Sequence, residues 1–144
     1  MAELNEQCEG VLFYYVSGLL IPSFVGSHVV LMKTFDFLEY IKRSVEIRVT
    51  ILRLIPSTAS RIVKDPAVRK RDLICVNIVL CAGAYLSSEV VRELQTMLCG
   101  TYILGGYGVS EGTTTSLRES WSEAEAGSVG KPAAGVLIRV VDEN

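Results

Sequence analysis

The sequence has little of what metal sites and nucleic-acid-binding proteins use. It holds one histidine, His28, and four cysteines without a CxxC pair, and together these cannot complete a zinc site. An excess of charge of one sign is also missing, because 14 basic and 16 acidic residues give a net charge of −2. No electrostatic surface for nucleic acid is therefore indicated. His28 opens an apolar stretch, where a structural histidine is more common than a ligand.

A secretory signal and a clear membrane span are missing as well. Residues 1–6 are acidic and polar, and the cysteines show no disulfide pattern, so we expect a reducing compartment and a cytoplasmic protein. Residues 11–32 contain no formally charged side chain, and this uncharged stretch is long enough to suggest a membrane helix. Gly18, Pro22 and Gly26 interrupt this stretch, so a buried helix followed by a buried strand is favoured over a membrane span.

The chain is long enough for one domain with a hydrophobic core. Its 144 residues are 49% hydrophobic, and the mean hydropathy of +0.36 is high for an independent soluble domain. We therefore expect some apolar surface that another part of a protein covers.

Strand-like and helix-like segments alternate from residue 28 to residue 108. Strands are expected at residues 28–32, 49–55, 77–82, 102–104, 113–117 and 136–141. The helices between the first four strands begin at residues that suit helix starts, namely Asp36, Pro56 and Ser87. This alternation with short connections predicts an α/β layered fold with a largely parallel sheet.

The helix that follows Asp36 has the clearest pattern. Asp36 and Glu39, three residues apart, outline a capping box, and Phe35 and Tyr40 occupy the positions of a hydrophobic staple. The spacing i, i+3, i+7 predicts a buried face made of Leu38, Ile41 and Val45.

Residues 104–115 concentrate groups that bind ligands: four glycines, one aromatic ring, one carboxylate and four aliphatic hydroxyls. Glycines such as Gly106 and Gly108 let a backbone approach a ligand closely, and Tyr107 could stack on a flat ring. Ser110 could bond a phosphate oxygen, and Glu111 could hold a hard cation such as Mg²⁺. A Gly-rich turn leading into a Thr-rich strand is the structural alternative, and the spacing alone leaves both open.

Two loops are expected at the ligand-binding edge of the sheet. In parallel sheets ligands collect outside the carboxyl ends of the strands, and residues 83–86 and 105–108 follow two such ends. Their convergence favours a functional interpretation. The spacing Gly106-x-Gly108-x-x-x-Gly112 misses the dinucleotide fingerprint by one residue, and residues 127–132 do not form a P-loop.

Four stretches also resemble motifs of one known family. Residues 106–111 are similar to Gly-Tyr-Gly-Met-Thr-Glu, and residues 81–87 resemble Ser-Gly-Ala-Ala-Pro-Leu. Residues 127–132 are identical to its Gly-Ser-Val-Gly-Lys-Pro turn, and residues 13–19 resemble Phe-Phe-His-Ile-Tyr-Gly-Leu. The family is that of the adenylate-forming (AMP-binding) enzymes, especially acyl-CoA synthetases of the coumarate–CoA ligase and luciferase kind.

This resemblance implies an ATP-dependent ligase. Such enzymes join a carboxylic acid to AMP, release pyrophosphate, and usually pass the acyl group to coenzyme A. Carried over by position, the resemblance implies that the nucleotide (ATP or AMP) contacts Gly83, Ala84, Gly106, Tyr107, Gly108 and Ser110. Ser110 and Glu111 would be the catalytic residues, with Glu111 also holding Mg²⁺. Ser17 and Gly106 would border the acyl substrate.

The chain also departs from the family pattern. Tyr15 stands where the family has the histidine that orients the carboxylate, Ala82 replaces a glycine, Tyr85 a proline and Gly105 a glutamine. No Ser/Thr/Gly-rich phosphate loop precedes Phe13 in these 144 residues. We therefore expect residues 1–10 to be an unmatched polar N-terminus and residues 11–144 to be a middle slice of the AMP-binding domain, without the phosphate loop and the C-terminal domain.

The leading hypothesis is thus a truncated acid-activating ligase domain that is inactive alone. The alternative is a non-catalytic remnant or nucleotide-binding module, and Tyr15 and the missing phosphate loop favour it for the isolated chain. A membrane-associated protein that uses residues 11–32 is a third, weaker alternative. Because both ends fall within family motifs, we expect an incomplete reading frame, with a phosphate loop encoded upstream and a Tyr-x-x-Gly-Asp-like stretch downstream.

Overall fold

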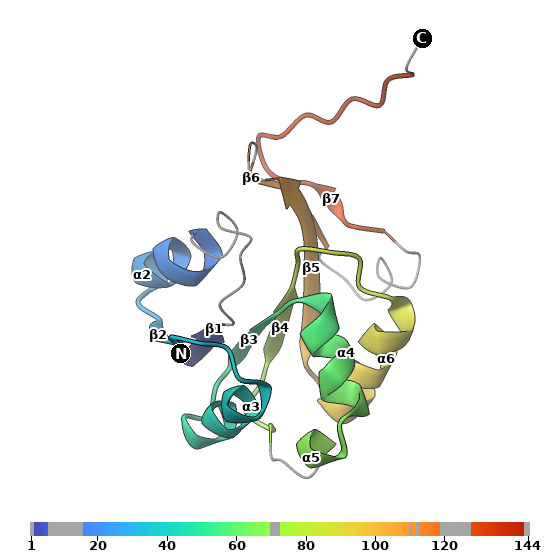
Figure 1. Ribbon diagram of the computed structural model, residues 1–144. Coiled ribbons are helices and arrows are strands. Elements are labelled where there is room, and N and C mark those ends of the chain that lie inside the picture. The colour runs from blue at the N-terminus through green and yellow to red at the C-terminus, as the bar shows by residue number, and fades with distance from the viewer. Residues whose placement is uncertain are drawn as a thin grey trace.

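The computed structural model describes residues 2–5, 16–69, 73–109, 111, 113–118 and 128–142 (Figure 1). The strands are β1 Ala2–Asn5, β2 His28–Leu31, β3 Ile51–Leu54, β4 Ile78–Cys81, β5 Tyr102–Val109, β6 Thr113–Arg118 and β7 Lys131–Pro132. The helices are the π-helical turn η1 Val16–Leu20 and α2 Ile21–Val25, α3 Phe37–Glu46, α4 Pro56–Lys64, α5 Pro66–Arg69 and α6 Ser88–Met97.

The strands form one sheet in the order β2-β1-β3-β4-β5-β6-β7. Neighbouring strands are parallel from β2 to β5, and β6 and β7 continue the sheet in antiparallel pairing. The expected α/β fold with a largely parallel sheet is confirmed. The steps β2 to β3, β3 to β4 and β4 to β5 all run in one direction, so right-handed crossovers put α3, α4 and α6 on the same face. Helices α4 and α6 lie side by side there (Figure 1).

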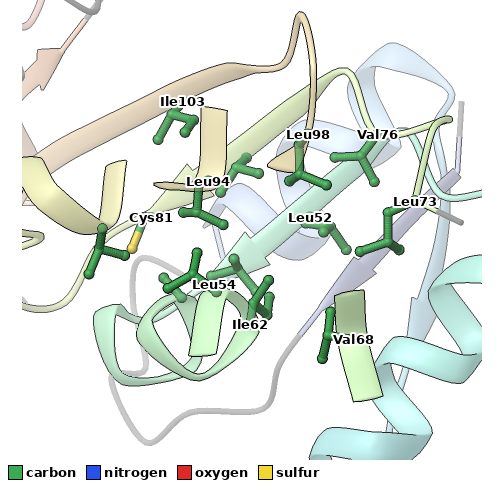
Figure 2. Packing of buried hydrophobic residues seen from close by; sticks show 14 of the residues in the cluster. Leu52, Leu54, Ile62, Val68, Leu73, Val76, Cys81, Leu94, Leu98 and Ile103 are labelled. Carbon is green, nitrogen blue, oxygen red and sulfur yellow. The ribbon is translucent and has the colours of Figure 1, made fainter. Parts of the chain in front are cut away.

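The hydrophobic core fills the space between that face and its helices. Alternate residues of the central strands point into it because strand side chains have a period of two. The members contributed by strands are Leu52, Leu54, Val79, Cys81 and Ile103, and those from α4 and α6 include Ile62, Val63, Val91 and Leu94. Figure 2 shows labelled members of this core, among them Leu52, Cys81 and Leu94, gathered between strands and helices. Full burial of one such aliphatic side chain contributes about 1.5–3 kcal/mol.

Helix α3 begins as the sequence predicts, and two of the three residues assigned to its buried face are confirmed: Ile41 is buried, and Val45 is partly buried against the core. The Asp36 side chain caps it by accepting from the Glu39 N–H at 2.8 Å, and the rings of Phe35 and Tyr40 lie 5.7 Å apart. The buried residues are Phe37, Tyr40, Ile41 and Ser44. Leu38 is 51% exposed, so its assignment to the buried face is wrong. The inward stripe is centred on Phe37 and Ile41, and Leu38 lies one step of about 100° further round the helix.

Residues 16–32, the described part of this stretch, form a helical segment and a strand as expected, but neither is buried as a whole. The helical segment ends at Gly26, whose φ of +69° reverses the chain before β2. Most of its apolar side chains are exposed, however: Phe24 is 93% accessible, whereas Pro22 is buried. The physical reason is topological: the step from β1 to β2 runs opposite to the other crossovers and puts η1 and α2 on the other face of the sheet. Within the described ranges, no helix is long and apolar enough to cross a membrane.

Two other strand assignments differ from the sequence-based expectation. Residues 2–5, which show no strand signal, form β1 between β2 and β3. Residues 136–141 form no strand although they are strongly apolar, because a strand needs a hydrogen-bonding partner and no described segment supplies one. They run away from the sheet toward the end marked C in Figure 1, with Leu137 99% exposed.

Paired alanine substitutions on α3 test which face is buried. We expect Ile41→Ala to lower the free energy of unfolding by about 2–5 kcal/mol, because it removes a core side chain. Leu38→Ala, on the same helix, should change it by less than about 0.5 kcal/mol. Urea unfolding followed by circular dichroism measures both values. Equal losses in the two variants would contradict the observed orientation of the helix.

Candidate functional site

The parallel pairing of three neighbouring strands ends at the same edge of the sheet. The register pairs Leu54 of β3 with Cys81 of β4 and Cys81 with Gly105 of β5. The segments that follow these residues therefore emerge side by side. They are Ile55, the loop of residues 82–87, and the second half of β5. This carboxyl edge of the sheet is the candidate site.

The loop after β4 is fixed at both ends. The Ala82 N–H donates to the Leu54 carbonyl at 3.3 Å, and Leu86 is buried in the core. The Ser87 side chain then caps α6 by accepting from the Val90 N–H at 3.4 Å. Local sequence explains this anchoring, since an apolar residue followed by a capping serine is a common helix entry.

Gly83 lies between these anchors in a conformation that favours glycine. Its φ is +96°, and a Cβ built there would lie 3.8 Å from the Ile55 Cγ2 atom. A side chain at position 83 therefore has room, and the preference for glycine comes from the positive φ of the backbone. Gly83, Ala84 and Tyr85 are all exposed at this edge, as a surface that meets a ligand must be. Their contact with nucleotide stays a prediction.

Residues 105–108 are not a loop, and the expectation that they are one is wrong. They continue β5 as far as Val109, because β6 supplies an antiparallel partner beyond the point where β4 ends. Tyr107 pairs with Ser116, and a bulge follows between Tyr107 and Gly108. Bulges change where side chains point and are common beside binding sites. Gly106 is half-buried, whereas Tyr107 (52%) and Gly108 are exposed.

The antiparallel pair is supported from its far side by the turn before β7. The Ser116 hydroxyl, 2% exposed, donates to the Val129 carbonyl at 3.1 Å. The Gly130 N–H donates to the Ser128 hydroxyl at 3.0 Å, and β7 then pairs with β6. Sequence reasoning missed this role of Ser116, and its position opposite Tyr107 can be found only once the strand register is known.

Glu111 is the described carboxylate in the turn that joins β5 to β6, and it is exposed. No group of three or more metal-ligating side chains occurs among the residues that the structure describes. One carboxylate still fits Mg²⁺, which commonly uses one or two protein carboxylates together with substrate phosphates and water. Glu111 is thus the residue here that could hold Mg²⁺, provided the ion arrives with a phosphate group.

The remaining predicted site residues are not located at atomic detail. Ser110 lies outside the described residues, although it stands between Val109 of β5 and Glu111. The backbone of Ser17 belongs to η1, but its side chain is outside the description. The structure therefore brings Gly83, Ala84, Tyr107 and Glu111 to one end of the sheet, and it leaves the place of Ser17 near an acyl group as a prediction.

Comparison with known proteins identifies the family. The profile described as AMP-binding enzyme matches residues 12–144. The chain belongs to the AMP-binding enzyme family. The resemblance inferred from the sequence motifs is confirmed.

Relatives within the AMP-binding family are ligases of plants and animals. The chain is 30% identical to 4-coumarate–CoA ligase-like 5 of Oryza sativa subsp. japonica over 82% of its own length. It is 31% identical to peroxisomal OPC-8:0-CoA ligase 1 of Arabidopsis thaliana over 89%, and 25% identical to acyl-CoA synthetase 7 of Caenorhabditis elegans over 91%. It spans 22%, 24% and 25% of the lengths of these three relatives, in that order.

Solved structures of AMP-binding enzymes share the fold. Anthranilate CoA ligase AuaEII, in complex with anthranoyl-AMP, superposes with a TM-score of 0.82 at 18% identity, over 99% of this chain and 28% of that one. The N-terminal domain of FACL13 from Mycobacterium tuberculosis gives a TM-score of 0.77 at 17% identity, over 91% of this chain and 33% of that one. The described sheet is therefore that of an N-terminal domain of an adenylate-forming enzyme.

Substituting Gly83 tests whether the backbone of the loop limits this site. We expect Gly83→Ala to lower the free energy of unfolding by about 1–2 kcal/mol, the cost of forcing an L-residue into a left-handed conformation. The added methyl has room, so no further loss from a clash should appear. Ala84→Ser in the same loop is the control and should unfold at the wild-type urea concentration. A Gly83→Ala variant as stable as wild type would show that the positive φ is not required.

Proposed function

We propose that this chain is the nucleotide-binding part of a ligase that activates a carboxylic acid with ATP. Membership of the AMP-binding family supports the reaction class. One observation carries the proposal. Tyr107 is held on a paired strand with its ring exposed, at the edge where the Gly83–Ala84 backbone is also exposed. A flat ring on Tyr107 and a glycine-lined backbone beside it suit an adenine nucleotide.

The reaction that follows from this proposal has two steps. A carboxylate oxygen of the acid attacks the α-phosphorus of ATP, and pyrophosphate leaves to give the acyl-adenylate. The thiol of coenzyme A then attacks the acyl carbon, and AMP leaves. In this scheme Tyr107 orients the base, Gly83, Ala84, Gly106 and Gly108 border the nucleotide, and Ser17 contacts the acid together with Gly106.

Phosphoryl transfer depends mainly on positioning and on charge neutralisation. The Ser110 hydroxyl is proposed to donate to the adenylate phosphate. The carboxylate of Glu111 would help hold Mg²⁺, which supplies positive charge against the phosphate oxygens. Both residues lie at the end of β5, so the strand that presents the Tyr107 ring also carries these polar groups.

Activity of these 144 residues alone is not part of the proposal. They contain no Ser/Thr/Gly-rich phosphate loop, and Tyr15 takes the position of the family histidine. We propose that the isolated chain binds nucleotide without completing adenylation, which overlaps with the alternative of a non-catalytic nucleotide-binding module. We also propose a cytoplasmic location, because Cys75 and Cys99 are free thiols and a reducing compartment keeps thiols in this state.

Two tyrosines on β5 provide a matched test of nucleotide binding. Tyr107→Ala should weaken AMP and ATP binding by about 1–3 kcal/mol, the usual value of a base–ring stack. Tyr102→Ala is the control, because Tyr102 is 70% exposed but stands at the opposite end of the same strand. Its removal should leave the affinity unchanged. Equilibrium dialysis with labelled AMP measures both, and equal affinities of the two variants would count against this site.

Pyrophosphate exchange into ATP tests the second part of the proposal. With a panel of aromatic and fatty acids, we expect the 144-residue chain to show no more exchange than its Glu111→Ala variant. The reason is that the groups which neutralise the transferring phosphates are not all present in these residues. Exchange clearly above the variant, dependent on one of the acids, would show that the chain itself forms an acyl-adenylate.

A further inference from the structure

A short apolar helix stands at the margin of the molecule with most of its side chains uncovered. Helix α2 and the turn η1 before it contact one another and lie away from α4 and α6 (Figure 1). The exposed side chains are Leu20 (44%), Ile21 (50%), Phe24 (93%) and Val25 (62%), which we call the α2 surface. At 3.6 residues per turn they lie within about 140° of the helix circumference, and the buried Pro22 lies outside that arc.

The α2 surface carries no charge. Residues 11–32 contain no formally charged side chain, so none adjoins this surface along the chain. The one hydroxyl on α2, that of Ser23, donates to the Leu19 carbonyl at 2.6 Å. Transfer of this surface out of water therefore desolvates no ion, and the hydroxyl keeps its hydrogen bond.

The backbone at the end of α2 is also hydrogen-bonded within the segment. Gly26 takes a left-handed conformation and its N–H donates to the Pro22 carbonyl. The Ser27 N–H donates to the same carbonyl at 2.8 Å. Pro22 itself has no N–H that would need a partner. Helical segments whose polar backbone groups are paired internally are the ones that can enter an apolar phase.

The C-terminal apolar stretch differs from the α2 surface in this respect. Residues 136–141 include Leu137 (99% exposed) and Val140 (93% exposed), but they belong to no strand, and no described segment forms a ladder with them. An extended backbone of this kind would carry unpaired N–H and C=O groups into an apolar phase, which is costly. Arg139 would add a charge. Exposed apolar side chains are therefore combined with a paired backbone at α2 and not at residues 136–141.

We propose that the α2 surface is a membrane-docking site that inserts into the interface of a phospholipid bilayer. Contiguous exposed apolar surface marks contact with a protein or a membrane. Protein interfaces take their specificity from a polar rim and from complementary charges. The α2 surface offers no charge for this purpose, whereas a bilayer interior requires only apolar side chains on a paired backbone.

The length of the segment limits how it meets the bilayer. η1 and α2 have five residues each, so together they extend about 15 Å at most, half the thickness of the hydrocarbon core. The segment therefore lies in the interfacial layer, with the Phe24 ring and its neighbours directed toward the acyl chains. The inference is independent of the proposed function, because none of the four side chains belongs to the nucleotide site.

Flotation of the 144-residue chain with phosphatidylcholine vesicles tests the docking site, because protein that aggregates sinks while protein bound to vesicles floats. We expect wild type to float. Phe24→Ser should lower the partition coefficient roughly tenfold or more, since burial of a phenylalanine side chain corresponds to at least that factor. Leu137→Ser is the control, because it removes a side chain of similar exposure from residues 136–141, and it should float as wild type does. Circular dichroism spectra that match wild type establish that both variants are folded.

Salt and fluorescence separate insertion from adsorption by charge. Raising the salt from ~0.1 to ~1 M shortens the Debye length from about 10 to 3 Å, and it should not weaken the binding of an uncharged surface. Phe24→Trp places a fluorophore in the docking site. Its emission should shift to the blue with vesicles and be quenched by brominated acyl chains, beyond the signal that Trp121 gives in wild type.

Four results would overturn the inference. Wild type that does not float has no docking site for lipid, and equal partition of wild type and Phe24→Ser would assign binding to another surface. Binding that is lost at high salt would be electrostatic. Concentration-dependent dimers that Phe24→Ser abolishes, in a chain that does not float, would show that a second copy covers the α2 surface instead of a bilayer.

Discussion

The in-register parallel ladder of β3, β4 and β5 is the constraint on which the candidate site depends. Because Leu54, Cys81 and Gly105 lie opposite one another, everything that follows them reaches the same edge. The ladder is held in this register by packing: one face carries Leu52, Val79 and Ile103 against the helices. Slipping any strand by one residue would turn its apolar side chains to the other face. The free energy that maintains the core therefore also maintains the site.

The antiparallel strands extend this constraint beyond the end of the parallel sheet. Without β6, the half of β5 beyond Gly105 would have no hydrogen-bonding partner on either side, since β4 has already ended. Pairing with β6 converts a glycine-rich stretch, which has a high conformational entropy when unfolded, into a fixed support for Tyr107. Ser116 and the turn at residues 128–130 stabilise that pairing in turn.

Sequence reasoning predicted the parts of the fold that local chemistry determines. The caps at Asp36 and Ser87, the helix start at Pro56 and the four parallel strands after His28 are confirmed, since each depends on neighbours in the chain. It failed where strand formation depends on partners that are distant in the sequence. Residues 2–5 form a strand because they pair between β2 and β3, and residues 105–109 do so because they pair with β6. Residues 136–141 have no such partner among the described residues and form no strand. At the site, the edge was predicted, whereas the strand conformation of Tyr107 and the support from Ser116 were not.

The structure also separates site residues that the fold explains from exposed site residues to which the described fold assigns no packing role. The positive φ of its loop requires Gly83, the cap of helix α6 requires Ser87, and residues 128–132 support β6. The agreement of these residues with family motifs is therefore compatible with a chain that binds no ligand. The exposed side chains of Tyr85, Tyr107 and Glu111 have no comparable role in the described structure. Exposed rings lower solubility and contribute little to folding. The argument for a functional nucleotide site therefore depends on these side chains, because the glycines and the turn would be required by the fold in either case.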